Sequence, residues 1–113
     1  QINPLDNFRI DSTDQNQYTL AFDNLYEKYG FMTPTEECSY DISFVKRDAD
    51  GSDGVILSTA EANEEKVVLP AKIRAAGPCD IEIRTIGRYE KWREKVIVSI
   101  DTAFNITGIH REE

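Results

Sequence analysis

Basic residues and long apolar runs are both scarce in this sequence. Its 113 residues include 13 Lys and Arg against 21 Asp and Glu, which gives a formal charge of -8 and a pI near 4.6. Binding to nucleic acid or to an anionic bilayer needs an excess of basic residues, so we expect neither partner. No apolar run approaches the roughly 20 residues that cross a bilayer. The first residues also have neither the basic nor the apolar region of a signal peptide, so a secreted form would be a processed or excised fragment.

Patterns typical of catalysis and metal binding are missing as well. The single histidine, His110, has no Ser or Cys elbow near it, and the chain contains no Gly-rich phosphate loop and no Cys/His metal pattern. The acidic turn with Asp48, Asp50 and Asp53 lacks the ligand spacing of an EF-hand loop and is typical of a solvated hairpin tip. The sequence therefore predicts a protein that is not an enzyme and that uses no cofactor or metal.

The most informative stretch that is present runs from Lys66 to Ile86. It contains a short apolar strand, a proline and glycine break, and then a strict alternation of apolar and polar residues. Alternation with a period of two is typical of an antiparallel strand with one buried face. The face expected to be buried consists of Cys79, Ile81, Ile83 and Ile86. The face expected to point to solvent consists of Asp80, Glu82 and Arg84.

Seven segments in all are predicted to be strands, and 113 residues are enough for one domain with its own core. The predicted strands are Asn7–Thr13, Tyr18–Phe22, Tyr40–Val45, Val55–Thr59, Lys66–Pro70, Cys79–Ile86 and Lys95–Asp101. The stretch 23–37 is expected to be a long connection, and Ala60–Glu65 a turn or brief helix. Short strands at regular spacing indicate an all-β, seven-stranded antiparallel β-sandwich.

The order of these strands and a few of their residues resemble a fibronectin type III domain over Asn7–Asp101. Phe22 stands where the family has a core tryptophan, Tyr40–Phe44 matches the third strand, and the stretch from Leu69–Pro70 to Ile86 matches the fifth and sixth. The resemblance implies a sandwich spanning residues 1–103, with 104–113 as a C-terminal tail or a linker to a following module. Immunoglobulin-like and other sandwiches remain alternatives.

Two residues depart from the family pattern. One is Phe22, in place of the core tryptophan, and the other is a cysteine. Cys79 stands where the family has a corner tyrosine. Cys38 and Cys79 are the two cysteines, and a pair in a small acidic domain suggests one disulfide in an oxidising compartment. In the family, however, the third and sixth strands run antiparallel side by side, so their starts lie about 17–20 Å apart. A disulfide needs Cα atoms within about 7 Å. Either the thiols are unpaired in this domain or the strand register differs from the one we expect.

A basic and aromatic segment between the last two predicted strands is the expected contact surface. Its residue types are those enriched at binding hot spots; the residues are Arg88, Tyr89, Lys91, Trp92 and Arg93. In the alternative interpretation Trp92 packs on the sheet beneath arginine side chains. The sequence Asn105-Ile106-Thr107 is an N-glycosylation acceptor, provided that the chain passes through a secretory pathway and Asn105 is exposed.

These observations together predict an extracellular module of a cell-surface receptor or adhesion protein. It would bind a protein ligand or neighbouring domains of the same chain, or act as a spacer between them. The alternative is an accessory domain of a secreted enzyme, in which the sandwich would position a catalytic neighbour or bind carbohydrate. Carbohydrate binding would need exposed aromatic rings on which sugars stack, and the candidates are Tyr89, Trp92 and either Tyr26 or Tyr29.

Overall fold

A computed structural model describes residues 5–13, 17–25, 39–46, 54–86 and 94–112 of the chain. These residues form eight strands and one short helix. In chain order the elements are β1 (Leu5–Ser12), β2 (Tyr18–Asn24), β3 (Ser39–Lys46), β4 (Val55–Ala62), β5 (Lys66–Val68), α2 (Ala71–Ala75), β6 (Cys79–Ile86), β7 (Lys95–Ile100) and β8 (Ile106–Glu112). The prediction of an all-β chain is confirmed. Within the described ranges, no helix has the length and apolar character that a bilayer crossing needs.

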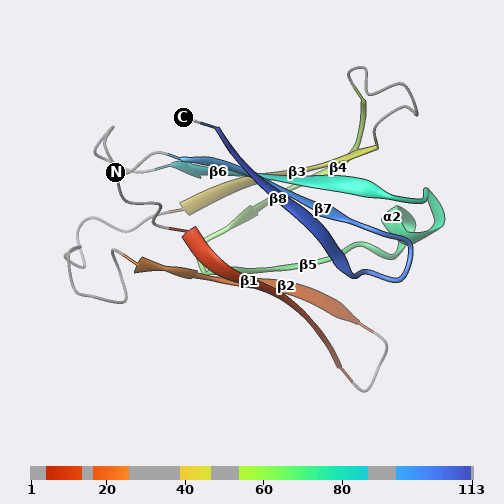
Figure 1. Cartoon of the computed structure of the whole chain (residues 1–113), viewed down its shortest axis with the longest axis horizontal. Coiled ribbons are helices and arrows are strands. Elements are labelled where there is room, and N and C mark those ends of the chain that lie inside the picture. The colour runs from red at the N-terminus through yellow and green to blue at the C-terminus, as the bar shows by residue number, and fades with distance from the viewer. Residues whose placement is uncertain (1–4, 14–16, 26–38, 47–53, 87–93, 113) are drawn as a thin grey trace.

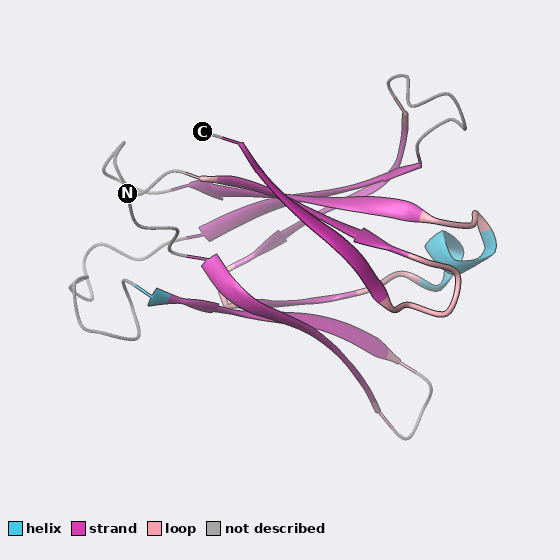
Figure 2. Ribbon diagram, viewed as in Figure 1, coloured by secondary structure: helices cyan, strands magenta, loops and turns pink. Residues whose placement is uncertain are grey.

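The strands form two antiparallel sheets that face each other as the layers of a sandwich (Figures 1 and 2). One sheet has three strands in the order β1-β2-β5, and the other has five in the order β4-β3-β6-β7-β8. Every paired strand is antiparallel to its neighbour. In particular, β3 and β6 lie side by side, as the sequence resemblance implies.

The core forms because alternate residues of both sheets point into the space between them. Phe22 of β2 meets Tyr40 of β3 across this space, with the ring centroids 5.0 Å apart in an edge-to-face arrangement. The Tyr40 hydroxyl accepts a hydrogen bond of 2.9 Å from Nδ2 of Asn24, which joins the two sheets inside the core. Ile42 and Phe44 are buried as predicted, while Asp41 is exposed and Ser43 half-buried on the opposite face of β3.

The predicted buried face of β6 is correct except at its last position. Cys79, Ile81 and Ile83 are buried, but the next inward residue is Thr85, which is 2% exposed. Ile86, which we expected to be buried, is 43% exposed. The period of two continues unbroken to the end of the strand, so an even-numbered residue faces solvent whatever its hydrophobicity.

Two segments between the predicted strands also differ from expectation. The expected turn or brief helix at Ala60–Glu65 begins as strand, because β4 continues to Ala62 and pairs there with Tyr40 of β3. The break after Pro70 contains the short helix α2, whose Ile73 is fully buried in the hydrophobic core. In both places tertiary pairing or burial decides the local structure.

The largest correction concerns the C-terminal segment 104–113, which we expected to be a tail or linker. Most of it forms β8, which pairs along β7 as the edge of the five-stranded sheet. The turn before β8 is held by Asp101, whose Oδ1 accepts hydrogen bonds from the backbone N–H groups of Ala103 and Asn105 at 2.9 and 2.8 Å. Phe104 adopts a φ of 62° in this turn and packs edge-to-face on the ring of Tyr18. The described chain therefore has eight strands instead of the predicted seven.

Candidate functional site

The two sheets of the sandwich meet along two sides, and the strand order defines both. The edges of the three-stranded sheet are β1 and β5, and those of the five-stranded sheet are β8 and β4. On one side Arg111, near the end of β8, bonds to the backbone of Leu5 at the start of β1, and on the other β4 contacts β5, to which residues 63–65 connect it. We call the junction between β1 and β8 the closed seam, and the junction between β4 and β5 the open seam.

The closed seam is filled by an arginine and a glutamate that bond to each other and to the backbone of β1. Nη1 of Arg111 lies 2.8 Å from Oε1 of Glu94 and donates a hydrogen bond of 2.6 Å to the carbonyl oxygen of Leu5. Oε2 of Glu94 accepts a hydrogen bond of 3.2 Å from the backbone N–H of Leu5. The guanidinium also lies over the ring of Phe8, 5.9 Å from its centroid. The Glu94 side chain is 8% exposed and the Arg111 side chain 25%, so the ion pair is partly buried, with the carboxylate on the inner side.

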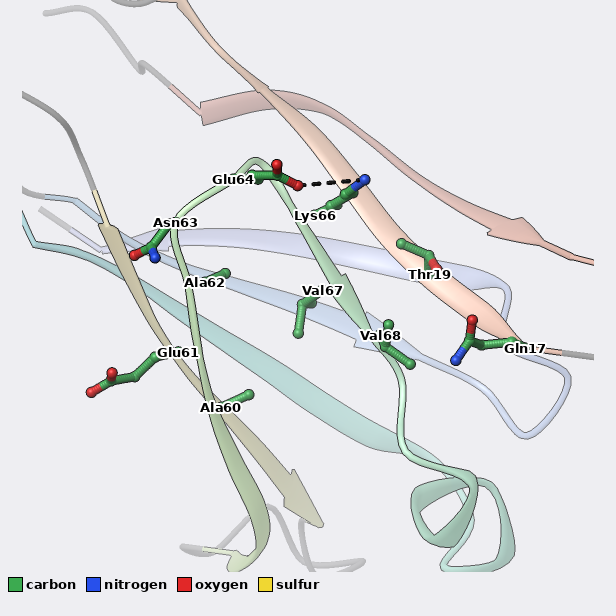
Figure 3. Close-up of a pocket in the computed structure, with 10 residues that line it drawn as sticks. All are labelled: Gln17, Thr19, Ala60, Glu61, Ala62, Asn63, Glu64, Lys66, Val67 and Val68. Atoms are coloured by element: carbon green, nitrogen blue, oxygen red, sulfur yellow. Dashed lines mark ion pairs between the residues drawn. The ribbon is translucent and has the colours of Figure 1, made fainter. Parts of the chain in front are cut away.

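The open seam has no such filling and contains a groove of about 690 Å³. Figure 3 shows Ala60 and Ala62 pointing from β4 toward β5, and Val67 pointing from β5 into the same space. Two alanine side chains on the inner face of β4 are too short to reach across, which explains why the groove remains. Its rim carries an ion pair of 3.4 Å between Lys66 and Glu64.

The strand that borders this groove, β4, offers an edge for further pairing. Among the described strands it pairs with β3 alone. Val55 and Ile56 at its start are 65% and 60% exposed, the most exposed large apolar side chains of the described residues. Gly54 leads into the strand, where any side chain would collide with the carbonyl oxygen of Lys46. An exposed edge with apolar side chains is a ready template for an added strand.

The outer face of the five-stranded sheet carries a row of charges that is balanced at one end and unbalanced at the other. At the β8 end, Lys95 pairs with Glu82 at 3.1 Å and with Glu112 at 3.5 Å. At the β4 end, Asp41 and Glu61 stand directly opposite each other across β3 and β4. Neither takes part in an ion pair within the described part of the chain. Like charges in directly opposite positions repel.

Most of the side chains that the sequence singled out lie outside the described residues. This applies to the predicted contact residues, the two candidate tyrosines of the carbohydrate alternative, the acidic turn and one cysteine, so their roles stay predictions. These residues are Arg88, Tyr89, Lys91, Trp92, Arg93, Tyr26, Tyr29, Asp48, Asp50, Asp53 and Cys38. In the chain, the segment with the contact residues lies between β6 and β7.

The glycosylation candidate is placed on the surface. Asn105 is exposed in the turn between β7 and β8, and its Nδ2 donates a hydrogen bond of 3.3 Å to Oδ2 of Asp101. The hydroxyl of Thr107 donates to the carbonyl oxygen of Ser99 at 3.2 Å. His110 is also exposed and lies opposite Ile97 on β7. Within the described ranges, no three His, Cys, Asp or Glu side chains gather where they could hold a metal ion.

Cys79 is a buried, free thiol at the start of β6. Burial raises its pKa to about 11, with a further contribution from the nearby Asp80 charge, so the thiol stays protonated and a poor nucleophile near neutral pH. Ser39, the first residue of β3, pairs with Ile86 at the far end of β6. The antiparallel register that argued against an intrachain disulfide from the sequence is therefore present.

The open seam was not apparent from the sequence. The sequence predicts a turn or brief helix at Ala60–Glu65, which forms part of its border, and the groove depends on two strands from different sheets. A partial signal existed in the alternation of Ala60 and Ala62 with polar residues, which is what a half-buried strand with small inward side chains would show. In three comparisons with known proteins, no family model, no curated protein and no solved structure matched this chain. The function is therefore inferred from the geometry of the chain itself.

Proposed function

We propose that this chain is an extracellular protein-binding module with a fibronectin type III-like sandwich, carried by a cell-surface receptor or adhesion protein. Two strand pairings support the fold type. The third and sixth strands are antiparallel neighbours, and the fourth strand pairs with the third. In the constant-type immunoglobulin sandwich, by contrast, the fourth strand joins the sheet of the first, second and fifth strands. The exposed acceptor Asn105 is compatible with a secretory pathway.

The open seam is the observation that carries the binding role. It combines a groove of about 690 Å³, which is within the size range of ligand sites, with an edge strand that presents exposed Val55 and Ile56. The described residues that line the groove are small aliphatic and polar, without an aromatic ring among them. Such a surface suits a polypeptide better than a sugar, which binds by stacking on aromatic faces.

Selection of peptides on the folded domain tests the proposal. We would select a phage library of random linear peptides of about ten residues, the length of a long strand, on the immobilised chain. Ala62→Arg fills the groove with a long side chain, and Ala103→Arg makes the same change on an exposed turn between β7 and β8. We expect enriched peptides to bind the wild type and Ala103→Arg equally, and to bind Ala62→Arg about tenfold more weakly or worse, because apolar contact in the groove is lost.

The same selection separates the seam from the loop that the sequence indicated. Trp92→Ala combined with Arg93→Ala removes the predicted loop contacts while the groove stays intact. If peptides lose binding to that double variant but not to Ala62→Arg, the loop is the binding surface and the seam is not. Failure to enrich any peptide, with all variants folded by circular dichroism, contradicts the binding role altogether.

A further inference from the structure

The strand β4 has a hollow on each of its two faces. On the inner face lies the open-seam groove, which Ala60 and Ala62 border. On the outer face, a second hollow of about 580 Å³ is flanked by Asp41 and Glu61. A strand that continued the sheet beyond β4 would place alternate side chains beside these two hollows, because successive residues of a strand point to opposite faces.

The charges on the outer face indicate what such a strand would carry there. Arg84, Asp41 and Glu61 stand in one row across β6, β3 and β4. Within this row Glu61 has the like charge of Asp41 on one side, and none of the described strands pairs with β4 on its other side. A cationic side chain on that other side would interact favourably with Glu61, since opposite charges in cross-strand positions stabilise a sheet.

We infer that the open seam binds an extended polypeptide segment that adds to β4 as a further strand, with Lys or Arg opposite Glu61 and small apolar side chains beside Ala60 and Ala62. The backbone of the segment would pair with the free edge of β4, as in other cases of strand addition. This inference rests on the proposed function and specifies the partner of the same seam.

The net charge of the chain favours a basic partner segment over a second copy of this chain. Each molecule carries a formal charge of -8, so two copies brought edge to edge repel each other, whereas a basic segment is attracted. The groove is also apolar on the side that a strand would cover, since Ala60, Ala62 and Val67 line it. Alternation of basic with small apolar residues is therefore the pattern that both faces of β4 accept.

Synthetic peptides with that pattern test the inference. The probe is a capped peptide of about nine residues that alternates valine with arginine and threonine. One control replaces its arginines with glutamate, and another carries methyl groups on the backbone nitrogens of one edge, which removes donors needed for strand pairing. Affinity is measured by fluorescence anisotropy at low salt, and amide resonances of β4 report the binding position. We expect each control peptide to bind about tenfold more weakly than the probe.

Variants of Glu61 provide the matched protein controls. Glu61→Gln should weaken binding of the arginine peptide by about threefold, because a single exposed ion pair contributes little free energy. Glu61→Lys should weaken binding of the arginine peptide by about tenfold and should strengthen binding of the glutamate peptide. Because either change removes repulsion from Asp41, we expect the denaturation midpoint to rise. Weaker binding therefore could not be attributed to unfolding.

The outcomes distinguish this inference from the proposed function. If Ala62→Arg weakens peptide binding, but backbone N-methylation of the peptide and the Glu61 variants do not, the inference is overturned. The open seam would then still be a binding site. A tight association of two chains through β4, detected by analytical ultracentrifugation, would also overturn it. If Ala62→Arg changes the binding of no peptide, both the inference and the seam as a binding site are wrong.

Discussion

The closed seam and the open seam each join an edge of one sheet to an edge of the other, but different side chains occupy them. At the closed seam, the long side chains of Arg111 and Glu94 reach from the five-stranded sheet and bond to the backbone of Leu5. At the open seam, the inward residues of β4 are Ala60 and Ala62, which leave a groove. The length of a few side chains at the sheet edges thus separates a stabilising junction from a surface that can bind.

The edges at the closed seam are also irregular in ways that discourage further pairing. β1 has a bulge between Asp6 and Arg9, where Asn7 adopts a φ of 55°, and β8 has a register shift opposite Ser99 and Ile100. Bulges and inward-pointing charges are common protections of edge strands. The open seam has an irregularity in the pairing of β3 with β4, but it leaves Val55 and Ile56 exposed at the edge. The two seams therefore suit opposite roles.

Removal of the arginine should open the closed seam and have the largest effect on stability. Arg111→Ala leaves the carboxylate of Glu94, which is 8% exposed, without its cation. Breaking a fully buried pair costs about 3 kcal/mol or more in the free energy of unfolding, and because Arg111 is partly exposed we expect about 2 kcal/mol here. Urea denaturation measures the change. The matched control is Arg9→Ala, because Arg9 pairs with Asp23 at 3.4 Å in an exposed position and should cost less than about 1 kcal/mol. Equal effects of the two substitutions would show that the closed seam is no stronger than an ordinary surface contact.

A smaller loss is expected where a hydrogen bond connects the two sheets behind the open seam. The Tyr40 hydroxyl accepts from Asn24 at 2.9 Å and donates to Oε2 of Glu65, just before β5, at 3.4 Å. Tyr40→Phe keeps the ring on Phe22 but removes both bonds, at a cost of about 1–2 kcal/mol. Hydrogen exchange should show faster opening of β5 than of β8. Uniform acceleration across both strands would mean that this bond does not act on the open seam in particular.

The sequence was sufficient for those strands whose alternation continues over a buried face. Ile81 and Ile83 in β6, and Ile42 and Phe44 in β3, face the core as predicted. Such residues need no knowledge of distant contacts, because burial of alternate side chains favours a strand wherever a sheet can form. At Ile86 the hydrophobicity of one residue suggested burial, but the strand period places it on the solvent face.

The last strand and the open seam depend on contacts that no local pattern contains. β8 has exposed residues over most of its length, and it is held in place by pairing with β7 and by the bond from Arg111 to Leu5, residues 106 positions apart. The groove likewise forms only where β4 of one sheet lies next to β5 of the other. The predicted contact residues around Trp92 lie outside the described part of the chain, so their role stays a prediction.

The smallest expected effect concerns the turn that carries the chain from β7 into β8 and so delivers Arg111 to the closed seam. Hydrogen bonds, first of all from the backbone N–H of Asn105, lower the pKa of Asp101 below its ordinary value of 3.8. A lowered pKa means that the ionised form is favoured by the fold, so its contribution is present above pH 3.8 and is lost as the pH falls through the lower folded value. Amide resonances of Ala103 and Asn105, which donate to this carboxylate, should shift together with a midpoint below 3.8, and those of β4 should not follow them. Asp101→Asn should abolish this shared transition. A midpoint at or above 3.8, or a transition that persists in Asp101→Asn, would show that a group other than Asp101 causes the transition in this turn.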